Sequence, residues 1–315
     1  MNDEERKCDM ASFSIGVDLG GTKIAGILVD DTLQPVAKEQ VKVDPERKVE
    51  RVIDQVCEVA HAMQRKVPSG SKLAGLGLSF PGLLDLESNV MVYSENLDWR
   101  DVPVGAMVKG RIDIPFYLEH DVRSGAIAEV FYGAGREYRD ILYLSVGTGI
   151  SGTLIWNRNI IRGAHGISAE IGHMVCQVEG PPCRCGLEGC LEALASGSAL
   201  EREAYHLVRK PVSGREVIER AQRGEEPYRM IVRRAAAYLG VGCANVVKIF
   251  DPEVVILGGG VMEAEKYLLP LVDTVYKASH SGVPVMPVLV AGKFKSMASV
   301  AGAAALPFLK GEGLL

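Results

Sequence analysis

Apolar residues recur along the chain in two patterns, short continuous runs and longer stripes with helical spacing. The runs predict buried strands at 13–18, 24–29, 73–80, 114–118, 141–146, 150–156, 254–257 and 288–291. The stripes predict helices at 49–63, 194–208, 216–223, 228–250 and 299–308, with a further helix starting at Asp121. Strands that alternate with helices in this way predict an α/β fold.

Two pairs of predicted strands are joined by short turns of glycine and threonine, Leu19–Lys23 and Gly147–Gly149. A plain hairpin explains such a turn. A phosphate cradle explains the first one equally well, because glycine amides approach anions closely and Asp18 could hold Mg²⁺ through water. The recurrence of the turn suggests a duplicated unit with two phosphate-contacting turns.

The most unusual chemistry lies between residues 163 and 192, where three cysteines follow a histidine at short range. His173, Cys183, Cys185 and Cys190 make up a Cys3His set, which suits a closed tetrahedral Zn²⁺ site. The alternative is a set of incidental buried thiols. Three thiols within eight residues, in a glycine-containing loop, favour zinc. A site filled by four protein ligands predicts a structural ion that holds the loop and its glutamates in place.

Asp121 directly follows a predicted strand and begins a predicted helix. Aspartate is a good N-cap, so a structural role explains its position. A general base at the carboxyl end of a strand explains the position as well, because ligands of α/β sheets bind at that edge. The spacing alone does not separate these two interpretations, and both can hold. Asn96 has a similar ambiguity between a turn former and a hydrogen-bonding group.

Size and composition limit the class of protein. The chain has 315 residues, enough for two domains, and 47% hydrophobic with 24% charged residues is typical of a folded soluble protein. A formal net charge of −5 gives no electrostatic reason to expect nucleic acid or an anionic membrane as a partner. Seven cysteines, with three clustered, predict a reducing compartment with a metal site. With no apolar leader and no uncharged apolar run of spanning length, we expect a cytoplasmic protein.

Taken together, these motifs resemble those of the ROK family (repressor, open reading frame, kinase), from about Ser14 to about Phe308. The most specific part is the stretch from Gly163 to Glu192. The resemblance implies a two-domain actin-like (ribonuclease H-like) ATPase fold with an interdomain cleft. It implies an N-terminal α/β domain of residues 1–121 plus about 299–315, and a C-terminal domain of residues 122–298 that carries the zinc loop.

The resemblance also implies a glucokinase-like activity, ATP-dependent phosphorylation of a hexose or N-acetylhexosamine with Mg²⁺, in a homodimer. Asp121 would be the general base. The implied ATP site consists of Asp18, Gly20, Gly21, Thr22, Lys23, Thr148, Gly149, Gly258 and Gly259. The implied sugar site consists of Gly82, Asn96, His120, Asp121, Glu170, His173 and Glu192, with one ring nitrogen of His173 on zinc and the other on the sugar.

Four positions depart from the family pattern. His120 and Arg123 stand where asparagines are usual. This difference bears on the identity of the sugar more than on the type of reaction. Ser168-Ala169-Glu170 replaces the common Ala-Gly-Glu. The family also contains sugar-responsive repressors with a winged helix-turn-helix, for which about a dozen residues before the first strand are too few. We therefore expect an enzyme, with a non-catalytic sugar-binding regulator as the alternative.

Overall fold

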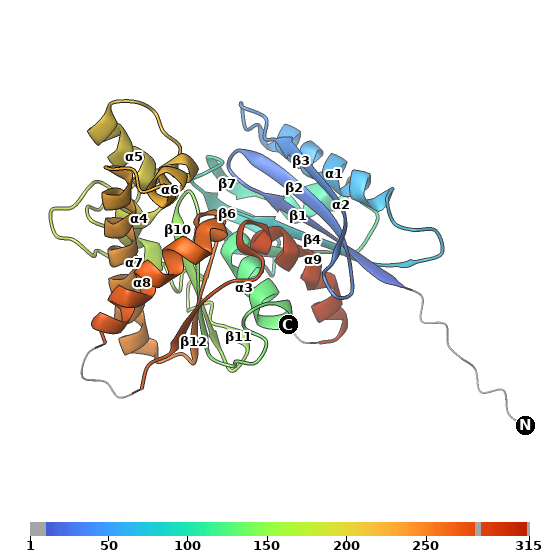
Figure 1. Ribbon diagram of the computed structural model, residues 1–315. Helices are drawn as coiled ribbons and strands as arrows, with labels where there is room; N and C mark the ends of the chain where they lie inside the picture. Colours follow the sequence, from blue (N-terminus) through green and yellow to red (C-terminus); the bar gives the residue numbers. More distant parts are fainter. Residues whose placement is uncertain (1–10, 281–284, 314–315) are drawn as a thin grey trace, which may run out of the picture. The chain divides into compact units, whose positions relative to one another are not determined.

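The computed structural model describes residues 11–280 and 285–313 (Figure 1). The chain forms two compact units. Unit 1 runs up to Ser124 and takes in the segment from Ser299 onward, whereas unit 2 is Gly125–Ala298. The α/β class and the two-domain actin-like fold predicted from the sequence are confirmed.

The sheet of unit 1 has the strand order β3-β2-β1-β4-β8. Its strands are β1 (Ser12–Leu19), β2 (Lys23–Asp30), β3 (Pro35–Lys42), β4 (Lys72–Phe80) and β8 (Phe116–His120). β1, β4 and β8 are parallel, so their carboxyl ends share one edge, whereas β2 runs antiparallel beside β1 and β3 runs antiparallel beside β2. Asp18 and Asp121 stand at this edge, at the ends of β1 and β8, which is where ligands bind in α/β sheets.

Two helices cover opposite faces of this sheet: α1 (Val49–Gln64) and α9 (Ala298–Gly311). Val59 of α1 packs on Gly26, and the α9 backbone packs on Gly16 and Gly77. A Cβ atom on Gly77 would collide with the carbonyl oxygen of Ala303, so glycine is what lets this helix approach the strands. The helix predicted at 299–308 is thus confirmed, and it packs tightly on the strands.

The rest of unit 1 is a small sheet with short connections that the hydrophobic pattern did not predict. It consists of β5 (Leu83–Asp85), β6 (Val90–Ser94), β7 (Trp99–Val102) and α2 (Val104–Lys109). Trp99 begins β7, where it is 2% exposed. These strands are too short for a two-residue alternation to stand out.

Unit 2 repeats the topology of unit 1, with the strand order β11-β10-β9-β12-β13. Its strands are β9 (Ile141–Val146), β10 (Ile150–Trp156), β11 (Asn159–Ile160), β12 (Val254–Gly258) and β13 (Val288–Ala291). Again a glycine hairpin, β9-β10, is followed by parallel neighbours. The duplication suggested by the two glycine turns is therefore present in the fold.

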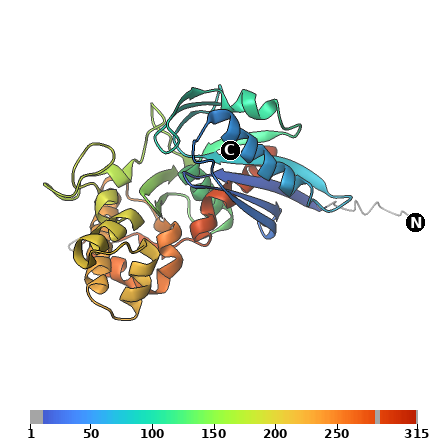
Figure 2. The ribbon, with the colours of Figure 1, turned by 90° about the horizontal axis from the view of Figure 1, so that it is seen from above.

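The helices of unit 2 gather on one side of that unit, yellow to orange in Figure 2. They are α4 (Leu191–Ala195), α5 (Gly197–Val208), α6 (Gly214–Gln222), α7 (Tyr228–Phe250) and α8 (Glu265–Ala278), while α3 (Asp121–Tyr132) starts in unit 1 and continues into unit 2. Short 3-10 turns occur at Ile171–His173, Gly260–Ala264 and Lys295–Met297. The glycines inside α7 serve close packing as expected, because a Cβ on Gly240 would lie 2.8 Å from the Val272 carbonyl oxygen of α8.

Helix α7 is also, among the described residues, the one helix long and apolar enough to cross a membrane. Its apolar window is 61% buried within the structure. Val232, Leu239 and Cys243 belong to the core of unit 2. Burial of this kind is typical of a core helix, which passes the same test of length and composition.

Candidate functional site

At the parallel edge of unit 1, Asp18 is held by two serines that the sequence did not single out. Ser79 Oγ donates to Asp18 Oδ1 at 2.9 Å, and Ser299 Oγ lies 2.7 Å from the same oxygen. Ser299 Oγ is also 3.1 Å from the backbone oxygen of Asp121. One hydroxyl at the start of α9 therefore contacts both predicted site aspartates. The available signal for Ser79 was a polar residue near the carboxyl end of an otherwise apolar strand.

Burial and, to a smaller extent, the neighbouring charge of Asp121 raise the pKa of Asp18 to about 6. The hydrogen bonds from Ser299 and Ser79 act in the opposite direction, as does Lys23. The carboxyl group therefore occupies a place where its negative charge is costly without a bound cation. A single carboxylate beside a glycine turn fits the oxygen chemistry that Mg²⁺ prefers.

The Asp121 side chain is only partly covered and makes two contacts through the same oxygen. Oδ1 accepts from the Val122 amide at 2.7 Å and lies 3.3 Å from His120 Nε2. Within the described part of the chain, His120 Nδ1 is buried and has no hydrogen-bond partner. Both interpretations of Asp121 are compatible with this geometry, because one carboxylate oxygen accepts from an amide in the first turn of α3 while the side chain remains 38% exposed.

The first glycine turn lies against Asn96. The Gly20 amide donates to the Lys23 carbonyl at 2.9 Å, and a Cβ on Gly21 would be 3.7 Å from the Asn96 Cβ. Thr22, Lys23 and Asn96 are exposed. Gly82 has φ +120° and faces the backbone of Tyr93 and Ser94, so a larger residue would displace the strand before Asn96. Six predicted residues of unit 1 are thus grouped around the ends of β1 and β4.

In unit 2 the second glycine turn lies against a predicted sugar ligand. Glu192 Oε2 accepts from the Ile150 amide at 2.9 Å, and a Cβ on Gly149 would collide with that oxygen. The Gly147 carbonyl accepts from Gly197 at 2.8 Å, and the exposed Thr148 carries the tip of the turn. The turn is therefore joined to the starts of α4 and α5.

Gly258, the last residue of β12, and Gly259 are buried and closely packed. A Cβ on Gly258 would be 2.6 Å from Tyr143 Oη, and Gly259, with φ +86°, faces the Val146 backbone. These contacts explain why both positions are glycine by packing alone. Their predicted place beside the adenosine stays a prediction.

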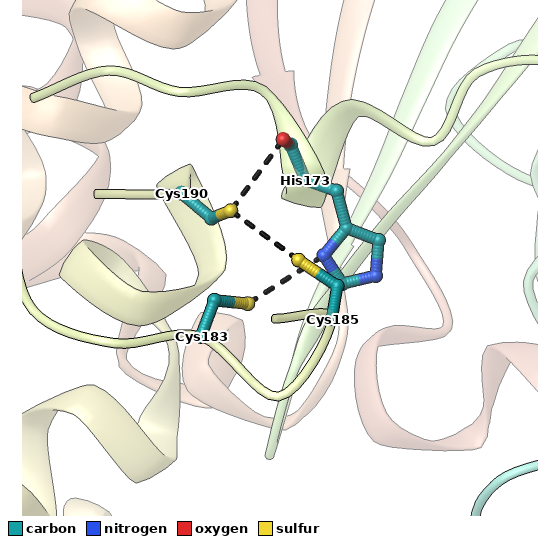
Figure 3. Close-up of side chains that lie close together, drawn as sticks. All are labelled: His173, Cys183, Cys185 and Cys190. Carbon is teal, nitrogen blue, oxygen red and sulfur yellow. Dashed lines mark hydrogen bonds between the residues drawn. The ribbon is translucent and has the colours of Figure 1, made fainter. Parts of the chain in front are cut away.

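The four predicted zinc ligands come together in unit 2 (Figure 3). Their ligand atoms all lie within 4.8 Å of one another. His173 Nδ1 is 3.6 Å from Cys183 Sγ, and Cys185 Sγ is 3.6 Å from Cys190 Sγ. Tetrahedral zinc places two sulfurs about 3.8 Å apart and a sulfur and a nitrogen about 3.6 Å apart. The residues present therefore fit Zn²⁺, and the ring nitrogen on the metal side is Nδ1.

Local backbone geometry explains how a short loop gathers these thiols. Gly186 and Gly189 have φ of +88° and +72°, where glycine is favoured. The Cys183 amide donates to the Leu187 carbonyl at 2.8 Å, which closes a tight turn around Cys185. Burial raises the pKa of the Cys190 thiol to about 12, with the neighbouring thiols adding to the effect. A divalent cation is what such a group needs in order to ionise.

Glu170 and Glu192 flank this cluster. Glu170 is exposed and precedes the 3-10 turn that carries His173, whose amide donates to the Glu170 carbonyl at 3.0 Å. Cys183 Sγ is 3.9 Å from Glu192 Oε1. Ala169, one of the departures from the family pattern, has φ +63°, where glycine is favoured. The loop therefore carries local backbone strain just before Glu170.

Comparison with known proteins identifies the class of this chain. The model of the ROK family matches residues 14–308, and the chain belongs to that family. A ROK hexokinase structure from Thermus thermophilus has a TM-score of 0.80 and 36% identity, covering 96% of this chain and 99% of that one. A glucokinase from Streptomyces griseus, in complex with glucose and AMPPNP, has a TM-score of 0.83 and 28% identity over 93% and 98%.

Sequence relatives include both enzymes and regulators. The glucokinase of Thermotoga maritima is 33% identical over 81% of this chain and 84% of its own length. The xylose repressor of Bacillus spizizenii is 31% identical over 82% of this chain and 67% of its own length. The chain spans about two thirds of the xylose repressors that it matches. Family membership thus supports a sugar ligand and leaves two activities to be distinguished.

Proposed function

We propose that the protein transfers the γ-phosphoryl group of ATP to a hydroxyl of a hexose or N-acetylhexosamine. The observation that carries the proposal is the pairing of Asp18 and Asp121 through Ser299, at the carboxyl ends of parallel strands. One aspartate lies beside a glycine turn suited to phosphate, and the other presents a half-exposed carboxylate. Phosphoryl transfer needs this combination of alignment, charge neutralisation and one base.

In this reaction Asp121 accepts the proton of the sugar hydroxyl, whose oxygen attacks the γ-phosphorus while the bond to ADP breaks. The Val122 amide and His120 both contact Oδ1 and so fix the orientation of the carboxylate. The turn with Gly20, Gly21 and Thr22 orients the phosphates. When Mg²⁺ is bound, Asp18 would hold it and the ion would neutralise phosphate charge.

For the other predicted residues we propose the roles that the resemblance implies. In unit 1, Gly82, Asn96 and His120 would hydrogen-bond the sugar, and Lys23 would face phosphate. In unit 2, Glu170, His173 and Glu192 would hydrogen-bond sugar hydroxyls, with zinc on His173 Nδ1 leaving Nε2 for the sugar. Thr148 and Gly149 would contact phosphate, and Gly258 and Gly259 the adenosine. Clustered thiols that bind zinc suit a reducing, cytoplasmic compartment.

A coupled assay of ADP release over a panel of sugars tests the proposal. The panel consists of glucose, mannose, N-acetylglucosamine, N-acetylmannosamine and xylose. We expect MgATP-dependent turnover with at least one hexose or hexosamine. A thermal shift with a sugar but no turnover with any of them would favour the second candidate, a sugar-binding regulator, for which the similarity to xylose repressors is the specific support.

Removal of the zinc tests the role of the Cys3His loop. Purified protein is expected to contain about one zinc per chain, and Cys185→Ser to lose it, because closed structural sites need all four ligands. The sugar KM should then rise by about 10-fold or more, as is usual when support of a ligand shell is lost. Elemental analysis and the ADP-release assay measure both effects.

Cys176→Ser is the matched control, because this half-buried thiol lies in the same segment but outside the ligand set. It should keep both zinc and sugar KM. Equal loss of zinc in the two variants would contradict the ligand assignment. An unchanged sugar KM in zinc-free Cys185→Ser protein would contradict the proposed link between the metal and the sugar.

A further inference from the structure

Arg47, which lies in the connection between β3 and α1, has a backbone conformation that L-residues seldom adopt. Its φ is +52°, in the left-handed region. Such a conformation costs about 1 kcal/mol or more and persists where surrounding contacts determine it. In unit 1 those contacts reach segments far away in the sequence.

The backbone of Arg47 is fixed on both sides. Its amide donates to the Asp44 carbonyl at 3.0 Å, and its carbonyl accepts from Trp99 Nε1 at 3.0 Å. Trp99 is 2% exposed, so this indole is itself held firmly at the start of β7. The strained residue is therefore anchored to the core of unit 1.

The guanidinium of Arg47 bridges two loops that carry proposed ligands. Nη1 donates to the Asn96 carbonyl at 2.7 Å, and Nη2 donates to the Gly21 carbonyl at 3.4 Å. Gly21 is in the proposed phosphate turn and Asn96 is a proposed sugar ligand. The same connection holds the turn once more, because the Val43 amide donates to the Thr22 carbonyl at 3.1 Å. Arginine suits this task, since its planar fork presents several donors in fixed directions.

We propose that Arg47 is a positioning residue that couples nucleotide binding to sugar binding in unit 1. Its guanidinium donates to a backbone carbonyl of each loop, so movement of the phosphate turn on binding nucleotide is passed to the Asn96 loop through one rigid fork. The inference rests on the proposed kinase function, since Gly21 and Asn96 belong to the proposed phosphate and sugar sites.

The test is a binding cycle in which D-glucose affinity is measured by calorimetry with and without saturating Mg–AMPPNP. In the unaltered protein we expect AMPPNP to change the glucose affinity by about 5-fold or more, the lower end of ordinary coupling between sites. Arg47→Gly removes the guanidinium and also relieves the left-handed backbone, so it is expected to fold at least as well. In this variant the change should fall below about 2-fold while each ligand alone still binds.

Arg51→Ala is the matched control, because Arg51 is another exposed arginine of unit 1, paired with Glu58 at 3.4 Å on the surface of α1. It should keep the coupling of the unaltered protein. Equal coupling in the Arg47→Gly variant, or none in the unaltered protein, would overturn the inference. A protein that binds both ligands with coupling but shows no turnover on the sugar panel would instead refute the kinase proposal alone.

A second measurement follows Arg47 without sugar. The chain has two tryptophans, and Trp156 is 51% exposed, so Trp156→Phe leaves Trp99 as the single reporter. Titration of that protein with Mg–AMPPNP should change the emission of Trp99, and the change should disappear when Arg47→Gly is added. Emission that responds equally in both proteins, or in neither although AMPPNP binds, would contradict a link through Arg47. Failure of AMPPNP to bind would refute the nucleotide site and this inference together.

Discussion

Asp121→Asn is expected to lower kcat by about 10²–10⁴-fold, the usual share of general base catalysis, while sugar binding is kept. The structure explains why the variant should fold. Both contacts of the carboxylate in the described structure use Oδ1, from the Val122 amide and from His120. An asparagine can place its carbonyl oxygen there and accept the same hydrogen bonds. Its NH2 group then occupies the position of the second oxygen, where it donates and cannot accept a proton.

Rate and binding are measured separately, by ADP release at saturating sugar and by calorimetry with AMPPNP in place of ATP. Asp113→Asn is the control, because Asp113 is an exposed residue in the loop before β8. It should leave kcat unchanged. If Asp121→Asn keeps full kcat, Asp121 serves only as the cap of α3 and the general base is another group. If the variant loses sugar binding as well as rate, the contribution to proton transfer is not separable from positioning.

Much of the frame of the protein follows from its sequence pattern. The runs at 141–146 and 150–156 and the stripe at 228–250 became β9, β10 and α7 at those bounds. Long buried elements are predicted well because nearly every position carries the signal. After the run at 254–257, β12 ends on Gly258, and a 3-10 turn comes before α8. The glycines are evident in the sequence. Where the strand ends and the turn begins, however, depends on packing against Tyr143 and Val146, which the sequence pattern does not show.

The candidate metal cluster was predictable from the residues alone because several reactive residues lie close together in the sequence. Three thiols and a histidine at close spacing predicted the cluster of possible zinc ligands. Ser79, Ser299 and Arg47 gave no such signal, because their partners lie far off in the sequence: Ser299 is 281 residues from Asp18. Serine and arginine are also common surface residues. A role that arises from tertiary contact alone cannot be read from local pattern.

Asp18→Asn is expected to stabilise the protein by about 3 kcal/mol at pH 7.5 in the absence of metal and nucleotide, since one pKa unit corresponds to about 1.4 kcal/mol. The direction of this change in the free energy of unfolding follows from the linkage between protonation and folding. Burial and the charge of Asp121 raise the folded-state pKa of Asp18 from 3.8 to about 6. Between these values the native state binds more protons than the unfolded chain, so the free energy of unfolding falls as pH rises. Above pH 6 the full cost of the buried charge is present.

Asparagine carries no charge at any of these pH values and can still accept from Ser79 and Ser299 with its carbonyl oxygen. The gain should therefore shrink to about 1 kcal/mol at pH 4.5, below the folded-state pKa, and vanish in more acid solution. Urea unfolding at the two pH values measures the difference, with Asp113→Asn as the exposed control. A gain that is equal at both pH values would contradict a charge effect.

The same substitution should remove the proposed kinase activity, because the cation proposed to lie beside the phosphates would lose its carboxylate. Asp18 would then destabilise the unliganded protein for the same reason that it binds the cation. A site for Mg²⁺ and triphosphate needs a negative group held where water does not stabilise it. Mg²⁺ with AMPPNP should accordingly stabilise the unaltered protein more than the Asp18→Asn variant, which unfolding with and without the nucleotide measures. Equal stabilisation of both proteins would place the metal elsewhere, and Asp18 would then be a buried acid that serves the hydrogen bonds of Ser79 and Ser299 alone.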